Sequence, residues 1–395
     1  MTATAPATEP SATPQELISR ARALIPLLRS NVAATEELGN PVPENLEALR
    51  AAGLFRLTTP PDHGGLHPSM RTQVRIIAEV GRGCASTGWI VANHAASTEF
   101  TLILEAVATQ EIFGDNPDAV FLSAGCSPDS HAERVPGGLK VTARAPYASG
   151  CEISDWALLI GIPLHDDGKT TGAVNVLVPL AEAEIQQTWN VAGMRGTGTN
   201  GMTVTEVFVP DRRTLVVEKD NLDRLEELLN PTELVKGNLH SLSALVGAAQ
   251  GGLDIVGRSL EKGRPIAYST YRRSADSPVI QQLFTEATHL VDTASLHMLH
   301  VADVFDSLLP GEDLARVDRA RARMHSATAL SRAREGMQKL LDVAGTSGFA
   351  HANVLQSYWR DLEVGSRHAM LGLPMIVEDY GRALLGVGPT ITQYH

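Results

Sequence analysis

The stretch WNVAGMRGTGTNGMTVTEVFVPD, residues 189–211, joins a glycine-rich loop to a run of alternating apolar and polar residues. The alternation over 202–210 predicts a β-strand. Gly196, Gly198 and Gly201 have the GxGxxG spacing of a dinucleotide-binding motif. That motif needs a strand before the glycines and a helix after them, so that a phosphate meets the helix N-terminus. Because a strand follows the glycines here, we interpret the loop as a tight turn and reject a Rossmann fold.

The same β pattern extends from about Ala119 to about Val217. Short runs rich in valine, threonine and aromatic residues alternate there with turn signals such as VPGG (135–138) and HDDGK (165–169). The pattern predicts a middle antiparallel β domain over 118–220. It fits a small barrel and a sandwich equally well, so both remain open.

Helical periodicity flanks this block on both sides. Apolar residues recur every three to four positions from Pro14 onward, which predicts an N-terminal helical domain over 14–117. The same period returns after the β block and predicts a C-terminal helical bundle over 221–395. Residues 1–13 are rich in Thr, Ala and Pro and are expected to be a disordered leader. The expected fold class is therefore mainly α with a central β domain.

Composition excludes several classes of protein. The 395 residues carry a formal charge of −12, which disfavours nucleic acid as a partner because phosphate binding needs a basic surface. No run of about 18 apolar residues is present, so no membrane span is expected. Cys84, Cys126 and Cys151 are odd in number and lack CxxC spacing. That pattern argues against disulfides and zinc knuckles and suits a cytoplasmic protein.

Two pairs of residues invite a metal interpretation. Glu286 and His289 form a Glu-x-x-His pair, but a carboxylate-bridged di-iron site needs a second such pair, and the sequence has none. His297 and His300 lie one helical turn apart and could chelate a metal, although such histidines are more often structural. We therefore expect no metal site.

Five segments, at corresponding places in the three blocks, carry a resemblance to a known superfamily: CASTGWIVANH (84–94), PYASGCEISDWALL (146–159), WNVAGMRGTGTNGMTVTEVFVPD (189–211), YRRSADSPVIQQLFTEA (271–287) and YWRDLEVGSRHAMLG (358–372). They resemble the acyl-CoA dehydrogenase superfamily. Within it they look most like the group D flavin monooxygenases, which include hydroxylases of 4-hydroxyphenylacetate, dibenzothiophene and polyketide quinones. The resemblance implies an acyl-CoA dehydrogenase-like fold.

The dehydrogenase branch of this superfamily fits less well. Its members commonly place a catalytic glutamate after an Arg-Asp pair. Here the pair is Arg360-Asp361, but the position eight beyond Asp361 is Ala369. Glu363 is only two residues beyond Asp361 and would point to a different helix face. The monooxygenases instead carry a histidine about where His368 stands. Some dehydrogenases of the superfamily carry the base on another helix, so an acyl-CoA dehydrogenase-like FAD oxidoreductase remains the alternative.

The resemblance implies the oxygenase component of a two-component flavin-dependent monooxygenase. Such an enzyme takes reduced FMN or FAD (FMNH₂ or FADH₂) from a separate NAD(P)H:flavin reductase. The reduced flavin and O₂ then form a C4a-hydroperoxide, which hydroxylates an aromatic substrate, phenolic or of the polycyclic quinone type. A third possibility is a non-catalytic helical assembly protein that has kept the fold, and saturable binding of reduced flavin would exclude it.

Three residues are implied as catalytic by the resemblance. Ser149 matches a serine or threonine near flavin N5, its alternative being a turn serine that bonds its own backbone. His368 is expected to contact the peroxide edge of the flavin as a donor or proton relay, its alternative being an interhelical structural histidine. His94 lies where several relatives place a substrate-facing base that accepts a phenolic proton.

A further group of residues is expected to bind the flavin together with Ser149. Thr197 and Thr199 offer hydroxyl contacts, and Arg195 offers a forked donor in the glycine loop. Trp156 and Trp189 resemble residues that pack beside the isoalloxazine ring. Their alternative is the core of the β domain.

Two arginines are implied to act from a neighbouring subunit. Arg272 and Arg273 occupy the region in which the superfamily sends an arginine across a subunit interface to the flavin phosphate. Which of the two reaches the phosphate stays open. The expected assembly is a homo-oligomer, most simply a homotetramer, with a dimer as the minimum.

Overall fold

The N-terminal block is helical in the computed structural model, which describes residues 12–101, 106–218, 230–388 and 391. Its α-helices are α1 (Pro14–Ala23), α2 (Ile25–Ser30), α3 (Val32–Leu38), α4 (Pro43–Ala51), α5 (Met70–Gly83), α6 (Ala85–Thr101) and α7 (Ala106–Phe113). A capping box begins α1: the Thr13 hydroxyl accepts from the Glu16 N–H, and the Glu16 carboxylate accepts from the Thr13 N–H. Most of the expected leader, residues 1–11, lies outside the described residues.

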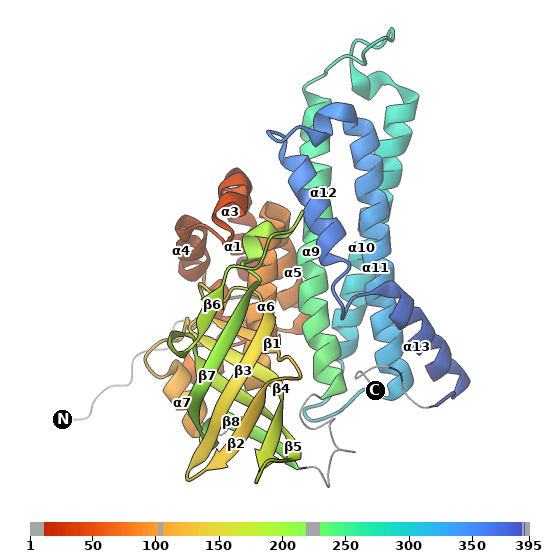
Figure 1. Ribbon diagram of the computed structural model, residues 1–395. Helices are drawn as coiled ribbons and strands as arrows, with labels where there is room; N and C mark the ends of the chain where they lie inside the picture. The colour runs from red at the N-terminus through yellow and green to blue at the C-terminus, as the bar shows by residue number, and fades with distance from the viewer. Residues whose placement is uncertain (1–11, 102–105, 219–229, 389–390, 392–395) are drawn as a thin grey trace, which may run out of the picture.

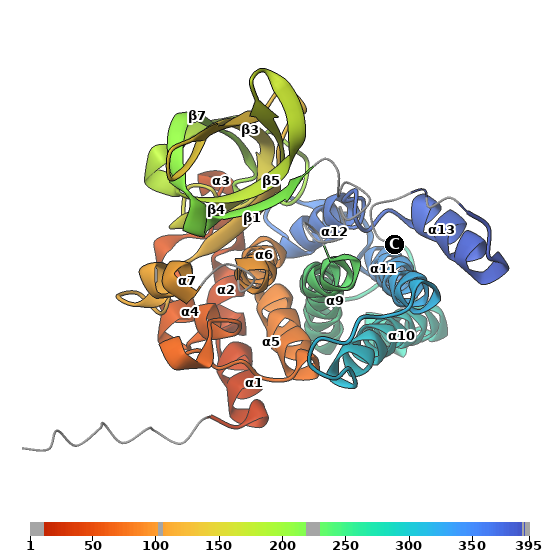
Figure 2. The same ribbon diagram turned by 90° about the horizontal axis from the view of Figure 1, so that it is seen from below.

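The middle block is one curled β-sheet, seen nearly end-on in Figure 2. Its strands are β1 (Phe121–Gly125), β2 (His131–Val135), β3 (Gly138–Ala148), β4 (Trp156–Asp166), β5 (Lys169–Pro179), β6 (Glu184–Gln186), β7 (Asn200–Pro210) and β8 (Thr214–Glu218). The order across the sheet is β6-β7-β3-β2-β4-β5-β8, with β1 beside β4. Most pairs are antiparallel, as expected. However, β4 runs parallel to both β1 and β2, which the residue pattern alone does not reveal.

The C-terminal block is a helical bundle, so the predicted fold class is confirmed. Its α-helices are α9 (Pro231–Glu261), α10 (Pro278–Asp306), α11 (Arg316–Ala344), α12 (Val354–Gly365) and α13 (Leu373–Leu385). Asn230 begins α9 by accepting hydrogen bonds from the first-turn N–H groups of Thr232 and Glu233. The boundary expected near residue 220 falls outside the described residues. In the described part of the chain, no helix is both long and apolar enough to cross a membrane.

The N-terminal helices and the bundle meet through very close backbone contacts. A Cβ on Gly247 of α9 would lie 2.1 Å from the carbonyl oxygen of Ala78 on α5. A Cβ on Gly81 of α5 would lie 2.2 Å from the carbonyl oxygen of Ala244 on α9. Glycine at both positions therefore allows α5 and α9 to touch along their backbones. The two helical blocks share one hydrophobic core, whereas the sheet has its own. Figure 1 shows the helices of the two blocks side by side, with the sheet next to them.

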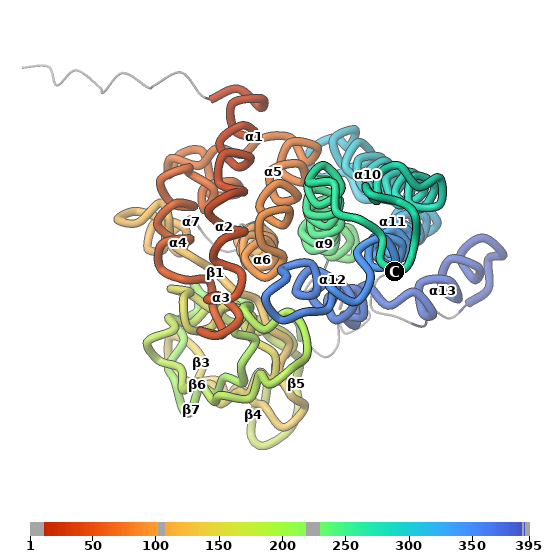
Figure 3. The backbone as a smooth tube through the Cα atoms, turned by 90° about the horizontal axis from the view of Figure 1, so that it is seen from above, coloured from red at the N-terminus to blue at the C-terminus, as the bar shows by residue number. Residues whose placement is uncertain are grey.

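A buried ion pair joins α13 to the bundle. Arg323 of α11 and Asp379 of α13 lie 2.7 Å apart, with side chains only 4% and 1% exposed. Helix α13 extends along the outer edge of the bundle beside α11 (Figure 3). The pair contributes to the attachment of α13, because a buried charge that loses a partner is costly.

Candidate active site

A cluster of buried hydroxyl groups lies where the sheet meets α6. Ser149 follows the end of β3, and its Oγ lies 2.8 Å from Oγ1 of Thr199. Thr199 Oγ1 lies 2.6 Å from Thr197 Oγ1 in the glycine loop. Trp89 of α6 donates from its indole Nε1 to Ser149 Oγ at 3.3 Å. The structure thus brings together three residues expected to bind flavin. It adds Trp89, for which the sequence predicted no role.

His368 joins this cluster from the C-terminal block. It lies in the turn after α12, and its ring meets the Trp89 ring edge-on, with centroids 5.4 Å apart. Solvent reaches the ring, yet the surrounding protein lowers the pKa of His368 by desolvation and so favours the neutral imidazole. The Met370 N–H donates to its Nδ1 at 3.4 Å. The ring proton then resides on Nε2, which leaves an N–H donor for a bound molecule.

The glycine loop is held by contacts on Met194. This residue has a left-handed φ of 56°, and its carbonyl accepts hydrogen bonds from Trp189 Nε1 and Thr197 Oγ1, both at 2.8 Å. Its N–H donates to the carboxylate of Asp361 on α12. Trp189 is therefore part of the support for the loop that carries Thr197 and Thr199.

Asp361 is the residue of this site that sequence reasoning missed. It appeared only as half of the Arg-Asp pair, but its fully buried carboxylate accepts from Met194 and, at 3.4 Å, from Ser86 Oγ of α6. Burial raises its pKa to about 7, against the lowering effect of the Met194 hydrogen bond. Its place in the Arg-Asp pair of α12 was the one signal in the sequence.

Asp361→Asn is expected to change how stability depends on pH. The Asp361 pKa is raised in the folded state, so its contribution to stability is full below about pH 4 and is lost as pH rises to about 7. Asparagine keeps an acceptor for Met194 but does not titrate. The melting temperature of Asp361→Asn, relative to that of the wild type, should therefore be higher at pH 8 than at pH 5. An equal difference at both pH values would contradict this account.

His94 does not have the surroundings of a substrate base. Its ring is fully buried, with Nε2 2.8 Å from the Phe55 carbonyl oxygen and Nδ1 accepting from the Phe121 N–H at 3.1 Å. Desolvation lowers its pKa to about 4. Both nitrogens serve backbone groups, so the geometry corrects the expected role: His94 ties α6 to β1 and to the segment after α4.

Two other residues expected at the flavin make no hydrogen bond to the hydroxyl cluster among the described residues. Trp156, at the start of β4, packs beside Phe113 and Leu158, with the Arg213 guanidinium 4.9 Å from its ring centroid. This cluster, between α7 and the sheet, is separate from the main core of the β domain. Arg195 lies in the glycine loop itself, where its side chain is exposed to solvent.

An exposed aromatic pair lies next to the cluster. Tyr147 precedes Ser149 by two residues on β3 and is 69% exposed. Its ring meets that of Trp189 at 6.5 Å and 81°. The two rings are nearly perpendicular and offer two aromatic faces close in sequence to Ser149, a combination of aromatic and hydroxyl groups that suits a flavin ring.

Arg272 and Arg273 are not brought to the cluster by their own chain. Both are exposed and lie between α9 and α10, at the end of the bundle far from the sheet (Figure 1). The structure therefore does not place them at the hydroxyl cluster of their own chain.

The residues considered for metal binding have other partners. Glu286 pairs with Lys339 of α11, and His297 Nδ1 lies 2.8 Å from Nδ1 of His325. Within the described ranges, the side chains of His, Cys, Asp and Glu do not gather into a group of three or more that could hold a metal ion.

Comparison with known proteins adds independent information. Residues 20–111 match the family model for the N-terminal domain of acyl-CoA dehydrogenase, and residues 239–372 match the one for its C-terminal domain. The chain is 30% identical to the flavin-dependent monooxygenase oxygenase subunit HsaA of Rhodococcus jostii (strain RHA1), over 95% of this chain and all of that protein.

Two further relatives point the same way. The oxygenase component of an FADH₂-dependent resorcinol hydroxylase from Rhizobium sp. (strain MTP-10005) is 28% identical, over 94% of this chain and 95% of that one. The solved structure of XiaF from Streptomyces sp., in complex with FADH2 and glycerol, superposes with a TM-score of 0.87 at 28% identity. It covers 96% of this chain and 98% of its own.

Proposed function

The chain belongs to the oxygenase subunits of flavin-dependent monooxygenases, which share the acyl-CoA dehydrogenase fold, and from this membership we propose that it hydroxylates an aromatic substrate with reduced flavin and O₂. The observation that carries the proposal is the meeting of Ser149, Trp89 and His368, one from each block of the chain. The dehydrogenase alternative lacks its base, since Ala369 stands at the expected position of the glutamate.

The residues present fit a flavin. Ser149, Thr197 and Thr199 offer hydroxyl groups to the polar edge of the ring system, and Tyr147 with Trp189 offers an aromatic surface. Either reduced FMN or reduced FAD satisfies these groups. Two relatives whose names or descriptions include FADH₂ favour FAD.

The chemistry of oxygen activation is supplied by the bound reduced flavin. Ser149 Oγ, oriented by Trp89 and Thr199, holds a proton at the inner edge of the site. His368 would offer its Nε2 N–H as a hydrogen-bond donor to an oxygen atom at the reactive edge of the flavin. The surrounding helices exclude water from the hydroxyl cluster, whose members are less than about a tenth exposed.

The separation of tasks between two proteins can be tested directly. The purified chain, given NAD(P)H, flavin and a panel of phenols, should give no product until a flavin reductase is added. With the reductase and ¹⁸O₂, one labelled oxygen atom should enter the product. NAD(P)H oxidation by the chain alone, or label from water, would contradict the proposal.

The three cysteines are free thiols, which fits an enzyme that works in the reducing cytoplasm.

We expect Arg272 and Arg273 to bind the flavin phosphate of a neighbouring subunit in a homotetramer. Replacing both by alanine should weaken reduced-flavin binding by about tenfold or more, because a charge-assisted hydrogen bond is worth about 1.5–3 kcal/mol. Arg332→Ala is the matched control, since Arg332 is an exposed bundle arginine paired within its own helix. Anaerobic binding titrations measure the difference.

Mixed oligomers make the subunit crossing visible. In a co-expressed mixture, a His368→Ala chain has intact arginines, and an Arg272→Ala/Arg273→Ala chain has an intact His368. When the two are neighbours in one oligomer, the arginines of the first can complete the flavin site of the second. Hydroxylation should then exceed that of either variant alone. No recovery in confirmed mixed oligomers, or a fully active monomer in light scattering, would remove the proposed role of these arginines.

A further inference from the structure

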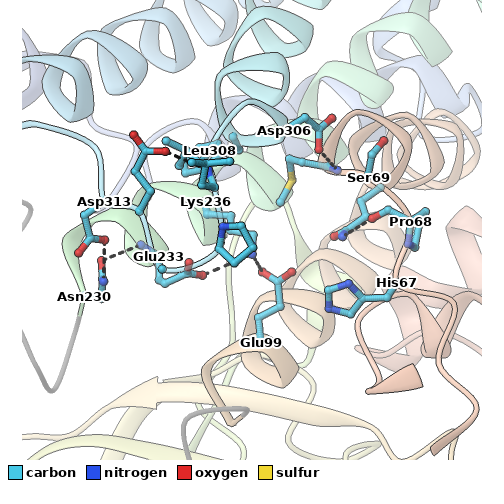
Figure 4. A pocket seen from close by; sticks show the side chains of 17 residues that line it. His67, Pro68, Ser69, Glu99, Asn230, Glu233, Lys236, Asp306, Leu308 and Asp313 are labelled. Atoms are coloured by element: carbon cyan, nitrogen blue, oxygen red, sulfur yellow. Dashed lines mark hydrogen bonds and ion pairs between the residues drawn. The ribbon is translucent and has the colours of Figure 1, made fainter. Parts of the chain in front are cut away.

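A cavity lies away from the hydroxyl cluster. It has a volume of about 480 Å³, which is in the range of small-molecule sites, and lies between the start of α5, the end of α6 and the α10–α11 connection (Figure 4). Glu99 lines it from the same helix as Trp89. The two residues are ten apart, which places the cavity about 15 Å along α6 from the flavin cluster.

The walls of this cavity carry an excess of negative charge. Five carboxylates line it against a single lysine, Lys236. Three of them already accept backbone or amide hydrogen bonds: Asp306 from Met70 N–H, Asp313 from Asn230 Nδ2, and Glu312 from Leu309 N–H. The remaining two, Glu99 and Glu233, share Lys236 at 3.1 Å and 3.5 Å.

Glu99 is the member whose hydrogen bonding is incomplete. It is nine-tenths buried, and one of its carboxylate oxygens, Oε1, has no hydrogen-bond partner in the described part of the protein. Its carboxylate lies between Lys236 and the His67 ring in Figure 4. A buried carboxylate oxygen without a donor is costly. The missing group is therefore a donor, and the surrounding charge favours a positive one.

The rest of the lining is apolar. Met70, Phe305, Leu308 and Leu309 border the same space. We infer that this cavity binds a small organic ammonium ion, whose N–H groups donate to Glu99 and Glu233 while a short hydrocarbon part packs on Phe305 and Leu308. A metal ion fits less well, because the described residues offer no group of three metal ligands here.

Calorimetric titration of the flavin-free protein with hexylammonium chloride tests this inference. The titration is run at pH 8.5, since burial raises the Glu99 pKa to about 7 and a higher pH keeps it ionised. We expect saturable binding with a Kd below about 1 mM. Hexanoate and hexan-1-ol, with the same chain but a negative or no charge, should bind at least about tenfold more weakly.

Variants separate the site from general effects. Glu99→Gln keeps the shape and removes the charge, and it should weaken hexylammonium binding by about tenfold. Glu286→Gln is the matched control, because Glu286 also pairs with a lysine but lies outside the cavity. Should Glu99→Gln fail to fold, the less buried Glu233→Gln should show a smaller loss in the same direction. Absence of saturable binding, equal binding of hexan-1-ol, or full affinity in the Glu99 variant would overturn the inference.

Discussion

His368→Ala is expected to uncouple the enzyme while leaving its fold and flavin affinity largely intact. His368 lies against Trp89, and the Met370 contact on Nδ1 leaves its Nε2 N–H available as a donor. Loss of one preorganised hydrogen-bond donor at a reacting oxygen typically lowers a rate by about 10²–10³-fold. Reduced flavin would still react with O₂, so hydrogen peroxide should replace hydroxylated product. The ratio of product to peroxide, measured with a reductase present, is the readout.

Two further variants make this result specific. His289→Ala removes an exposed histidine of α10 and should leave the ratio unchanged. His368→Gln retains an N–H donor of similar reach and should recover part of the product without restoring a titrating group. Wild-type coupling in His368→Ala would reduce His368 to a structural residue and leave Ser149 as the remaining catalytic candidate.

Asp379→Ala is expected to destabilise the protein by about 3–5 kcal/mol, a large part of the stability of an ordinary domain. It leaves the Arg323 guanidinium, only 4% exposed, without its carboxylate partner on α13. Chemical denaturation monitored by circular dichroism measures the loss. The matched control is Asp318→Ala, which breaks an exposed pair with Arg321 on the same α11 and should cost at most about 1 kcal/mol.

The double variant Arg323→Met/Asp379→Leu separates a buried charge from lost packing. Replacing both partners by apolar residues removes the desolvation cost, so the double variant should be more stable than Asp379→Ala alone. A cost for Asp379→Ala no larger than that for Asp318→Ala would show that the buried pair does not anchor α13.

The order of the three blocks was predictable because periodicity is a local property. The glycine loop and the strand β7 that follows it were predicted directly from residues 189–211. By contrast, the contacts that build the site were not predictable from any local pattern. Trp89 reaches Ser149 across 60 residues, and Asp361 reaches Met194 across 167. Such contacts depend on how α6 and α12 are packed against the sheet.

His94 shows how a correct helix can still yield a wrong role. Trp89 and His94 both lie on α6, but five residues turn an α-helix by about 140° beyond one full turn. With Trp89 facing Ser149, His94 must therefore face elsewhere, and it meets the backbone of Phe55 and Phe121. The sequence does not show which side of α6 faces the hydroxyl cluster. That depends on how α6 packs against the sheet and the other helices.

Anaerobic titration of the purified chain with reduced flavin tests the central claim most directly. Trp89 lies in the hydroxyl cluster and Trp189 supports it, so quenching of tryptophan fluorescence should follow flavin binding at this site. We predict saturation at one reduced flavin per chain, with affinity at least about tenfold higher than for oxidised flavin. Trp89→Phe should lose much of the quenching. Absence of saturable binding of reduced flavin, or a preference for the oxidised form, would contradict the account.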